Sequence, residues 1–287
     1  MTWGRGLRLR LLLAPCVGVL TLGFVIPVLL FLTQSLHSFS EGQVSTDWTL
    51  ATFSMFITDP FFRQTLFNSA ILSGVVTLIT LVMAYPVALQ MLYWRGSLLF
   101  SVLALVVFSP VLVSIIVRAY GWQLLLSNDG VINYALTQSG VITHPLRLIF
   151  NWTGVIISMV HVEIPFMMFP ILTVLLQLQP SLRDAARDLG ATELAVWRRV
   201  TLPLSLPGIL AGCQIVFTTA ISAFASPTIL GGGRVRVMPV TIFQNIVGLN
   251  WPMAAVQSIL LLLCSLLLVA IFSKVLSTRR VRGLQPA

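Results

Sequence analysis

Two ionisable side chains, His161 and Glu163, lie within a long apolar stretch of the sequence, close to Pro165. A charged side chain at the centre of a bilayer costs roughly 2.5 kcal/mol or more, so such a residue is a functional-site hypothesis by default. Glu163 either lines a transport path and attracts a cationic solute, or it is bonded to a neighbouring helix or a partner chain. At helical spacing His161, Pro165 and Met168 share one face, and Glu163 points elsewhere.

Polar residues and prolines interrupt other apolar stretches. Ser222 and Ser226 precede Pro227, and they either line the same path or pack between helices. The prolines at positions 86, 110, 165 and 170 each remove a helix hydrogen bond and favour a kink. Kinked helices suit a gated path, although proline is also common in membrane helices in general.

A further group of chemistry-bearing residues lies in the segment 177–206, which carries several charges of both signs. Ser181 is predicted to cap a short helix, which Gly190 ends in the left-handed conformation. Thr192 is predicted to cap a second helix, and Pro203 to mark its end. The pattern is typical of a helix-turn-helix lying beside the membrane.

The first of these helices has a small-residue face with charge around it. Ala185 and Ala186 allow another chain to come close, while Arg183, Arg187 and Asp188 surround them. Such a surface suits the cleft of a partner protein. The alternative is an amphipathic loop that rests on lipid headgroups with its basic residues toward phosphate.

The elements that must position these residues are membrane helices. The 287-residue chain is 57% hydrophobic and 9% charged, and its mean hydropathy is +0.97, far outside the balance of a soluble domain. We expect an all-α polytopic membrane protein, forming one transmembrane domain over residues 1–287. Six stretches are long enough to cross a bilayer: they lie near 11–33, 66–92, 97–117, 152–176, 206–230 and 251–274.

The surplus of basic residues indicates orientation. Seventeen Lys and Arg against eight Asp and Glu leave a net charge of +9. Placing the N-terminus inside puts most of the basic residues in cytoplasmic segments, which predicts that both termini are cytoplasmic. The first span follows Arg5, Arg8 and Arg10, and without a clear cleavage site it is interpreted as an uncleaved helix rather than a signal peptide. The net positive charge is therefore attributed mostly to membrane topology and does not indicate nucleic-acid binding.

Several other functional classes lack their residues. Cys16, Cys213 and Cys264 all lie inside apolar stretches, so neither a disulfide framework nor a zinc site is supported. The glycine-rich stretch 231–234 lacks the Lys-Ser/Thr of a phosphate-binding loop. The loops 34–65 and 118–151, expected outside, are candidate docking surfaces.

The cytoplasmic segment has a specific spacing. Asp184-Ala185-Ala186 is followed after three residues by Gly190, and after nine further residues by Val200-Thr201-Leu202-Pro203. This arrangement resembles the EAA loop of permease subunits of binding-protein-dependent ABC importers. Asp184 stands where the family has Glu, and Val200 where it has Ile.

The resemblance implies a type I ABC importer permease fold in a bacterial inner membrane. It implies that residues 184–191 form a coupling helix that docks on a separate ATPase subunit. The residues it assigns to coupling are Asp184, Ala185, Ala186, Arg187, Asp188, Leu189, Gly190, Ala191, Leu202 and Pro203. The implied partners are a second permease, two ATPase subunits and an extracytoplasmic solute-binding protein. The chain itself is expected to bind no cofactor, since ATP and magnesium would be held by the ATPase subunits.

Other segments, such as Val117-Arg118-Ala119-Tyr120-Gly121-Trp122, are similar to the spermidine/putrescine and opine branch of these permeases. A polyamine or related amine is the solute this implies. Permeases for opines, 2-aminoethylphosphonate or ferric iron share much of the pattern. His161, Glu163, Ser222 and Ser226 are the candidates for the substrate path.

The sequence is also compatible with two functions of other classes. One is a secondary transporter driven by protons through His161 and Glu163, although no inverted repeat is evident. The other is a non-transporting membrane scaffold, which would show no solute-dependent ATPase activity.

Overall fold

The computed structural model describes residues 13–40 and 42–282, with side chains to Lys274 in the last helix. Arg5, Arg8 and Arg10, on which part of the orientation argument rests, lie outside the described residues, as do positions 11 and 12 of the first predicted span. The described residues up to 64, together with 241–262, form one compact unit, and residues 65–240 with the rest of the last helix form another. The expected single domain over 1–287 stays a prediction.

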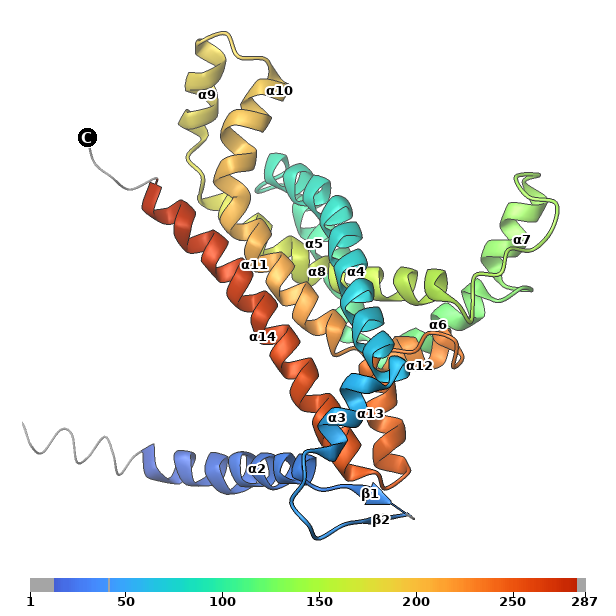
Figure 1. Ribbon diagram of the computed structural model, residues 1–287. Helices are drawn as coiled ribbons and strands as arrows, with labels where there is room; N and C mark the ends of the chain where they lie inside the picture. The colour runs from blue at the N-terminus through green and yellow to red at the C-terminus, as the bar shows by residue number, and fades with distance from the viewer. Residues whose placement is uncertain (1–12, 41, 283–287) are drawn as a thin grey trace, which may run out of the picture. The chain divides into compact units, whose positions relative to one another are not determined.

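Between its loops the described part of the chain forms helices and one two-stranded hairpin (Figure 1). Five of its helices are long and apolar enough to cross a membrane, or six if one sharply bent pair counts as a span. The five are Leu13–Leu36, Pro60–Tyr93, Trp152–Gln177, Glu193–Ile221 and Trp251–Lys274, and the bent pair is Leu98–Leu112 with Ile115–Gln138. An all-α membrane fold is therefore confirmed, while the boundaries of two predicted spans are wrong.

The first unit contains the N-terminal span and a short polar connection. The span includes a π-helical turn at Thr21–Val25, α2 (Ile26–Thr33) and a 3-10 turn at Gln34–Leu36; β1 (Phe39–Ser40), β2 (Gln43–Val44) and α3 (Ala51–Thr58) follow. The strands pair antiparallel. In the second segment of this unit, residues 241–262, the Asn245 amide donates to Oε1 of Gln257 at 3.0 Å. This bond joins α13 (Met238–Val247) to the start of α14 (Trp251–Arg282).

The core of the second unit lies where α8 (Trp152–Gln177) packs against α11 (Leu202–Ile221). Two glycines of α11 allow this close approach. A Cβ on Gly208 would lie 2.7 Å from the carbonyl oxygen of Pro170, and one on Gly212 would lie 2.8 Å from the sulfur of Met167. Small residues at helix contacts are typical of membrane proteins, because close packing replaces the hydrophobic effect there.

The helix α4 (Pro60–Tyr93) is the second long span. Its residues in the second unit carry buried hydroxyls: Ser69 accepts a hydrogen bond from the backbone N–H of Met238 at 2.7 Å, and the Tyr85 hydroxyl lies 3.1 Å from that of Ser205. Because lipid offers no hydrogen-bond partners, these contacts fix α4 against the segments that follow α12 and begin α11.

The third predicted span, 97–117, is not one continuous helix. α5 (Leu98–Leu112) ends early, Val113 is extended and Ser114 is non-helical, and α6 (Ile115–Leu126) starts in a new direction. The axis turns by 102° between the two parts of the pair. Pro110 has no N–H to give to Val106, whose carbonyl accepts from the Ser109 hydroxyl instead. Part of the expected outer loop 118–151 is thus helical, in α6 and in α7 (Val131–Gln138).

The fifth predicted span, 206–230, is wrong at both ends. The apolar helix runs over Glu193–Ile221, and a short α12 (Ala225–Gly231) follows after a break. The Ser222 hydroxyl bonds to the carbonyls of Thr218 and Thr219, and Pro227 cannot donate to the preceding turn. Both features favour ending the helix here, so Ser226 lies in α12 rather than in the span itself.

Candidate functional site

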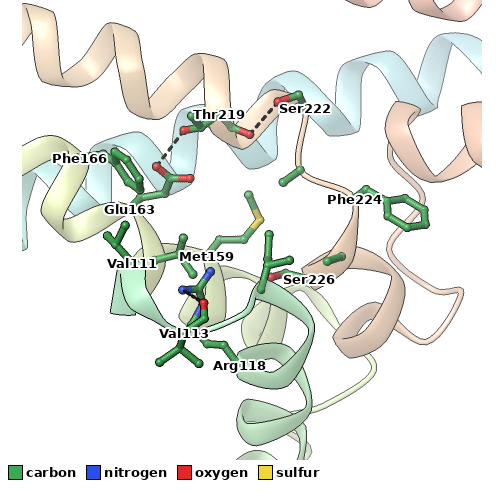
Figure 2. Close-up of a pocket in the computed structure, with 14 residues that line it drawn as sticks. Val111, Val113, Arg118, Met159, Glu163, Phe166, Thr219, Ser222, Phe224 and Ser226 are labelled. Atoms are coloured by element: carbon green, nitrogen blue, oxygen red, sulfur yellow. Dashed lines mark hydrogen bonds between the residues drawn. The ribbon is translucent and has the colours of Figure 1, made fainter. Parts of the chain in front are cut away.

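A cavity of about 600 Å³ lies in the second unit, at the breaks in the third and fifth spans. Its walls come from the end of α5, the start of α6, the middle of α8 and the segment joining α11 to α12 (Figure 2). Non-helical backbone at membrane depth is tolerated where it is buried in protein or lines a cavity. The two broken spans satisfy this requirement.

Glu163 is the acidic residue of this cavity. Its side chain is only 6% exposed, and its Oε2 accepts a hydrogen bond of 2.8 Å from the hydroxyl of Thr219 on α11 (Figure 2). The two sequence-based alternatives for Glu163 are therefore not exclusive in this geometry. The side chain is bonded to a neighbouring helix and it also contributes to the cavity wall.

Ser222 and Ser226 line the same cavity as Glu163. The Ser226 hydroxyl lies 3.2 Å from that of Ser158 on α8, and both are buried, whereas the Ser222 hydroxyl is bonded to backbone carbonyls of its own helix. Three of the four residues proposed for the substrate path are thus brought together.

His161, the fourth, lies elsewhere. It lines a separate cavity of about 430 Å³, and its Nδ1 accepts a hydrogen bond of 3.3 Å from the indole N–H of Trp122. This agrees with the helical spacing, which places His161 and Glu163 on different faces of α8. The pair does not form a direct proton relay in this structure.

Arg118 and Thr219 are cavity residues that sequence reasoning missed. Arg118 was expected in an outer loop, yet it lies in the first turn of α6 and is half-buried. Its guanidinium donates to the carbonyl oxygens of Pro110 and Val113, at the end of α5. A signal was available: an arginine directly after a proline-interrupted apolar run, where a helix end leaves carbonyls without partners.

The segment between the fourth and fifth spans forms a helical hairpin (Figure 1). α9 (Pro180–Asp188) has no buried residue, and α10 (Glu193–Val196) leads through a π-helical stretch, Trp197–Thr201, into α11. At its tip Leu189 is 89% exposed, and Leu194 is 71% exposed. The residues from Asp184 to Ala191, which the family resemblance assigns to coupling, therefore lie together on the hairpin, while Leu202 and Pro203 lie at the start of α11.

The turn of this hairpin is the one that the sequence predicts. Gly190 adopts a positive φ of 81°. The N–H of Ala191 donates to the carbonyl of Ala186 at 3.1 Å, and the N–H of Gly190 donates to the carbonyl of Arg187 at 2.8 Å. These two bonds define a Schellman motif at the end of α9. Thr192 caps the second helix as expected, since its hydroxyl accepts from the N–H of Ala195.

Two details of the predicted hairpin are wrong. Ser181 does not cap α9, because the helix begins at Pro180 and Gln179 is the N-cap residue; proline at the first helical position is already preorganised. Pro203 does not end the second helix either. The wide π-helical turn ahead of it leaves room for the proline ring, and the helix continues into α11.

An ion pair ties the two arms of the hairpin together. Arg187 donates from Nε and Nη2 to Oε1 and Oε2 of Glu193 at 2.7 and 3.2 Å, and from Nη1 to Asp184 at 3.0 Å. The hydrogen bonds to Glu193 raise the pKa of Arg187 above its ordinary value, so the guanidinium stays charged.

A family model described as "binding-protein-dependent transport system inner membrane component" matches residues 5–283. The chain belongs to this family of ABC importer permeases. A spermidine/putrescine transport system permease protein, PotB, from Haemophilus influenzae is 33% identical over 219 residues, 75% of each chain. Its counterpart from Escherichia coli K12 is 32% identical over 250 residues, covering 85% of this permease and 89% of the relative.

The fold is also that of a solved transporter. A bacterial alginate ABC transporter, in complex with an alginate pentasaccharide-bound periplasmic protein, contains a chain that superposes with a TM-score of 0.79 at 20% identity, covering 97% of the permease and 96% of that chain. At this identity the likeness shows the fold alone, which is the type I importer permease fold. The permease is a multi-pass inner-membrane subunit and not itself an enzyme, because the ATPase of such importers is a separate subunit.

Proposed function

We propose that this permease carries a polyamine such as putrescine or spermidine, or a related amine, across the inner membrane. The observation that carries the proposal is Glu163, a carboxylate on the wall of a cavity among the membrane helices. A carboxylate in a low-dielectric cavity attracts an ammonium group. The relatives described as spermidine/putrescine permeases, matched over most of the chain, support the same solute class.

The hairpin of α9 and α10 is proposed as the coupling element. Its exposed apolar tip at Leu189 and Leu194 and its small residues Ala185 and Ala186 suit insertion into a cleft of an ATPase subunit. The Schellman turn at Gly190 and the bonds of Arg187 stiffen it. A stiff hairpin continuous with α11 could carry the closing motion of the ATPase into the membrane helices.

The proposed assembly contains this permease, a second homologous or identical permease, two ATPase subunits and an extracytoplasmic solute-binding protein. ATP and magnesium are held by the ATPase subunits, and this chain binds no cofactor. Both termini lie in the cytoplasm, with α9 and α10 on the same side. Single cysteines in α9 and in the outer loop, labelled in intact spheroplasts by an impermeant maleimide, test the orientation: label on α9 contradicts it.

The experiment that tests the solute is ATPase activity in proteoliposomes with the cognate ATPase and solute-binding protein. Putrescine, spermidine, an opine, 2-aminoethylphosphonate and ferric iron are supplied in turn. Stimulation by putrescine or spermidine supports the proposal, and stimulation by one of the others alone reassigns the solute. Glu163→Gln is expected to raise the apparent KM for a cationic solute. If the kinetics and the expression level are both unchanged, the role of Glu163 is structural.

Transport that persists without ATP and collapses with the proton gradient would instead favour a proton-coupled mechanism. The geometry gives the proton-coupled mechanism little support, because His161 and Glu163 line different cavities.

A further inference from the structure

Arg118 occupies a special position at the break in the third span. It lines the cavity that contains Glu163 and also the cavity that contains His161, and Val113 is the other residue that the two linings share. The guanidinium therefore lies at the boundary between the two spaces. In Figure 2 it reaches toward the cavity from α6, while Glu163 and Thr219 approach from α8 and α11.

The bonds of Arg118 explain why its charge stays in place. Where α5 ends, the last carbonyls of the helix lack the regular partner four residues on, and they carry the negative end of the helix dipole. The guanidinium donates to two of them, at Pro110 and Val113. Both of these bonds come from Nη1, and the same side chain contributes to the walls of both cavities.

Arg118 and Glu163 are the two charged residues among those that line the larger cavity. The rest of its wall is apolar or carries hydroxyl groups, from Thr219, Ser222 and Ser226. Opposite charges in such a space interact much more strongly than in water. A positive charge fixed on the wall offsets the attraction that the carboxylate exerts on a cation.

We propose that Arg118 is a specificity-determining residue of transport, the resident counter-ion that weakens the hold of the Glu163 cavity on a cationic solute. This inference rests on the proposed function, in which the cavity receives an amine. An importer must release its solute on the inner side, so a cavity that bound a polyamine too tightly would slow turnover. Arg118 keeps the cavity close to neutral and the binding reversible.

The test measures putrescine binding to the permease–ATPase complex in nanodiscs by calorimetry, without the solute-binding protein. Arg118→Gln retains side-chain donors for the carbonyls but loses the charge, and it is expected to tighten binding on the order of tenfold. Glu163→Gln is expected to weaken it by a similar factor. Arg118→Lys keeps the charge and should bind as the wild type does.

Arg95 provides a matched control. Its guanidinium also donates a hydrogen bond to a carbonyl oxygen near the end of a helix, that of Leu176 in α8. Unlike Arg118, however, Arg95 is exposed and lines neither cavity. Arg95→Gln should therefore leave putrescine affinity unchanged.

The outcomes separate the two proposals. Unchanged or weaker binding in Arg118→Gln, with binding still lowered by Glu163→Gln, overturns the role of Arg118 and leaves the amine proposal standing. Arg118→Lys behaving like Arg118→Gln also overturns it, because the bonds rather than the charge would then matter. If Arg118→Gln fails to assemble, Arg118→Lys is compared with the double variant Arg118→Gln/Glu163→Gln. The first cavity keeps both charges and the second has neither, so both are neutral overall. Equal putrescine affinities support the proposal, and unequal affinities overturn it. No putrescine binding by the wild-type complex counts against the proposed function itself.

Discussion

Nε and Nη2 of Arg187 donate to the two carboxylate oxygens of Glu193 at 2.7 and 3.2 Å, which joins α9 to α10 across the Gly190 turn. A bidentate pair of this kind fixes orientation as well as distance. Both side chains are exposed, so solvent screens the pair while the hairpin is free. Docking against another protein would exclude that solvent and strengthen it.

Replacing Arg187 with Met is expected to loosen α9 relative to α10 and to raise the ATP hydrolysed per solute imported by about threefold, an effect of the modest size typical of exposed pairs. The measurement is coupled uptake and ATPase activity in proteoliposomes. The swapped pair Arg187→Glu/Glu193→Arg should restore part of the coupling, since it rebuilds the pair between the arms but loses the bond to Asp184. Arg198→Met, at an exposed arginine of the same loop, is the control, and an equal loss there would contradict a specific role for the pair.

Gly190 is expected to tolerate only residues that accept a positive φ. No atom lies within 4 Å of a Cβ built at this position, so a substitution acts through backbone conformation, at roughly 1–2 kcal/mol for most residues. Gly190→Val should reduce ATP-dependent uptake at least about tenfold, with insertion unchanged. Gly190→Asn, which enters the left-handed region more readily, should retain most uptake.

Gly190→Asp and Ala186→Glu add charge to the proposed docking surface and are expected to abolish ATP-dependent uptake without preventing membrane insertion. Uptake by membrane vesicles and the amount of chain in the membrane are compared for each variant. Normal transport by either of them with the full complex would show that α9 is not the coupling helix.

Gly208 is expected to be intolerant of any side chain. Its Cβ would meet the carbonyl oxygen of Pro170 at 2.7 Å, and the backbone of α8 cannot yield as a flexible side chain would. Gly208→Val should destabilise the permease by about 1–3 kcal/mol, seen as a lower melting temperature in detergent. Gly74→Ala is the matched control, since nothing lies within 4 Å of a Cβ there and alanine is the better helix former; a comparable loss at Gly74 would contradict the α8–α11 packing argument.

Thr219 is expected to support Glu163. Thr219→Val keeps the shape but removes the donor to a buried carboxylate, at a cost of about 1–3 kcal/mol, and should lower the melting temperature of the complex and alter its putrescine affinity. Thr219→Ser retains the hydroxyl and should resemble the wild type. In the Glu163→Gln background the effect of Thr219→Val should shrink, because the carboxylate is already gone; fully additive losses would argue against the bond.

Some features of the permease follow from the sequence because their causes are local. Runs of about 20 apolar residues must be helical in lipid, so the spans near 152–176 and 251–274 agree closely with Trp152–Gln177 and Trp251–Lys274. The left-handed turn at Gly190 and the Thr192 cap depend on neighbouring residues alone, and both are found. The fixed spacing from Asp184 to Pro203 was enough to indicate the family.

The cavity was decided by tertiary structure. Whether an apolar run stays straight depends on what can satisfy its backbone. At 97–117 the guanidinium of Arg118 does so across the break, and the Ser109 hydroxyl does so within the last turns of α5. The sequence placed Glu163 in a membrane helix, but only the packing of α8 against α11 places Thr219 beside it. Helical periodicity separates His161 from Glu163, yet it cannot say which neighbours each will meet, because the partners Trp122 and Thr219 lie 39 and 56 residues away in the sequence.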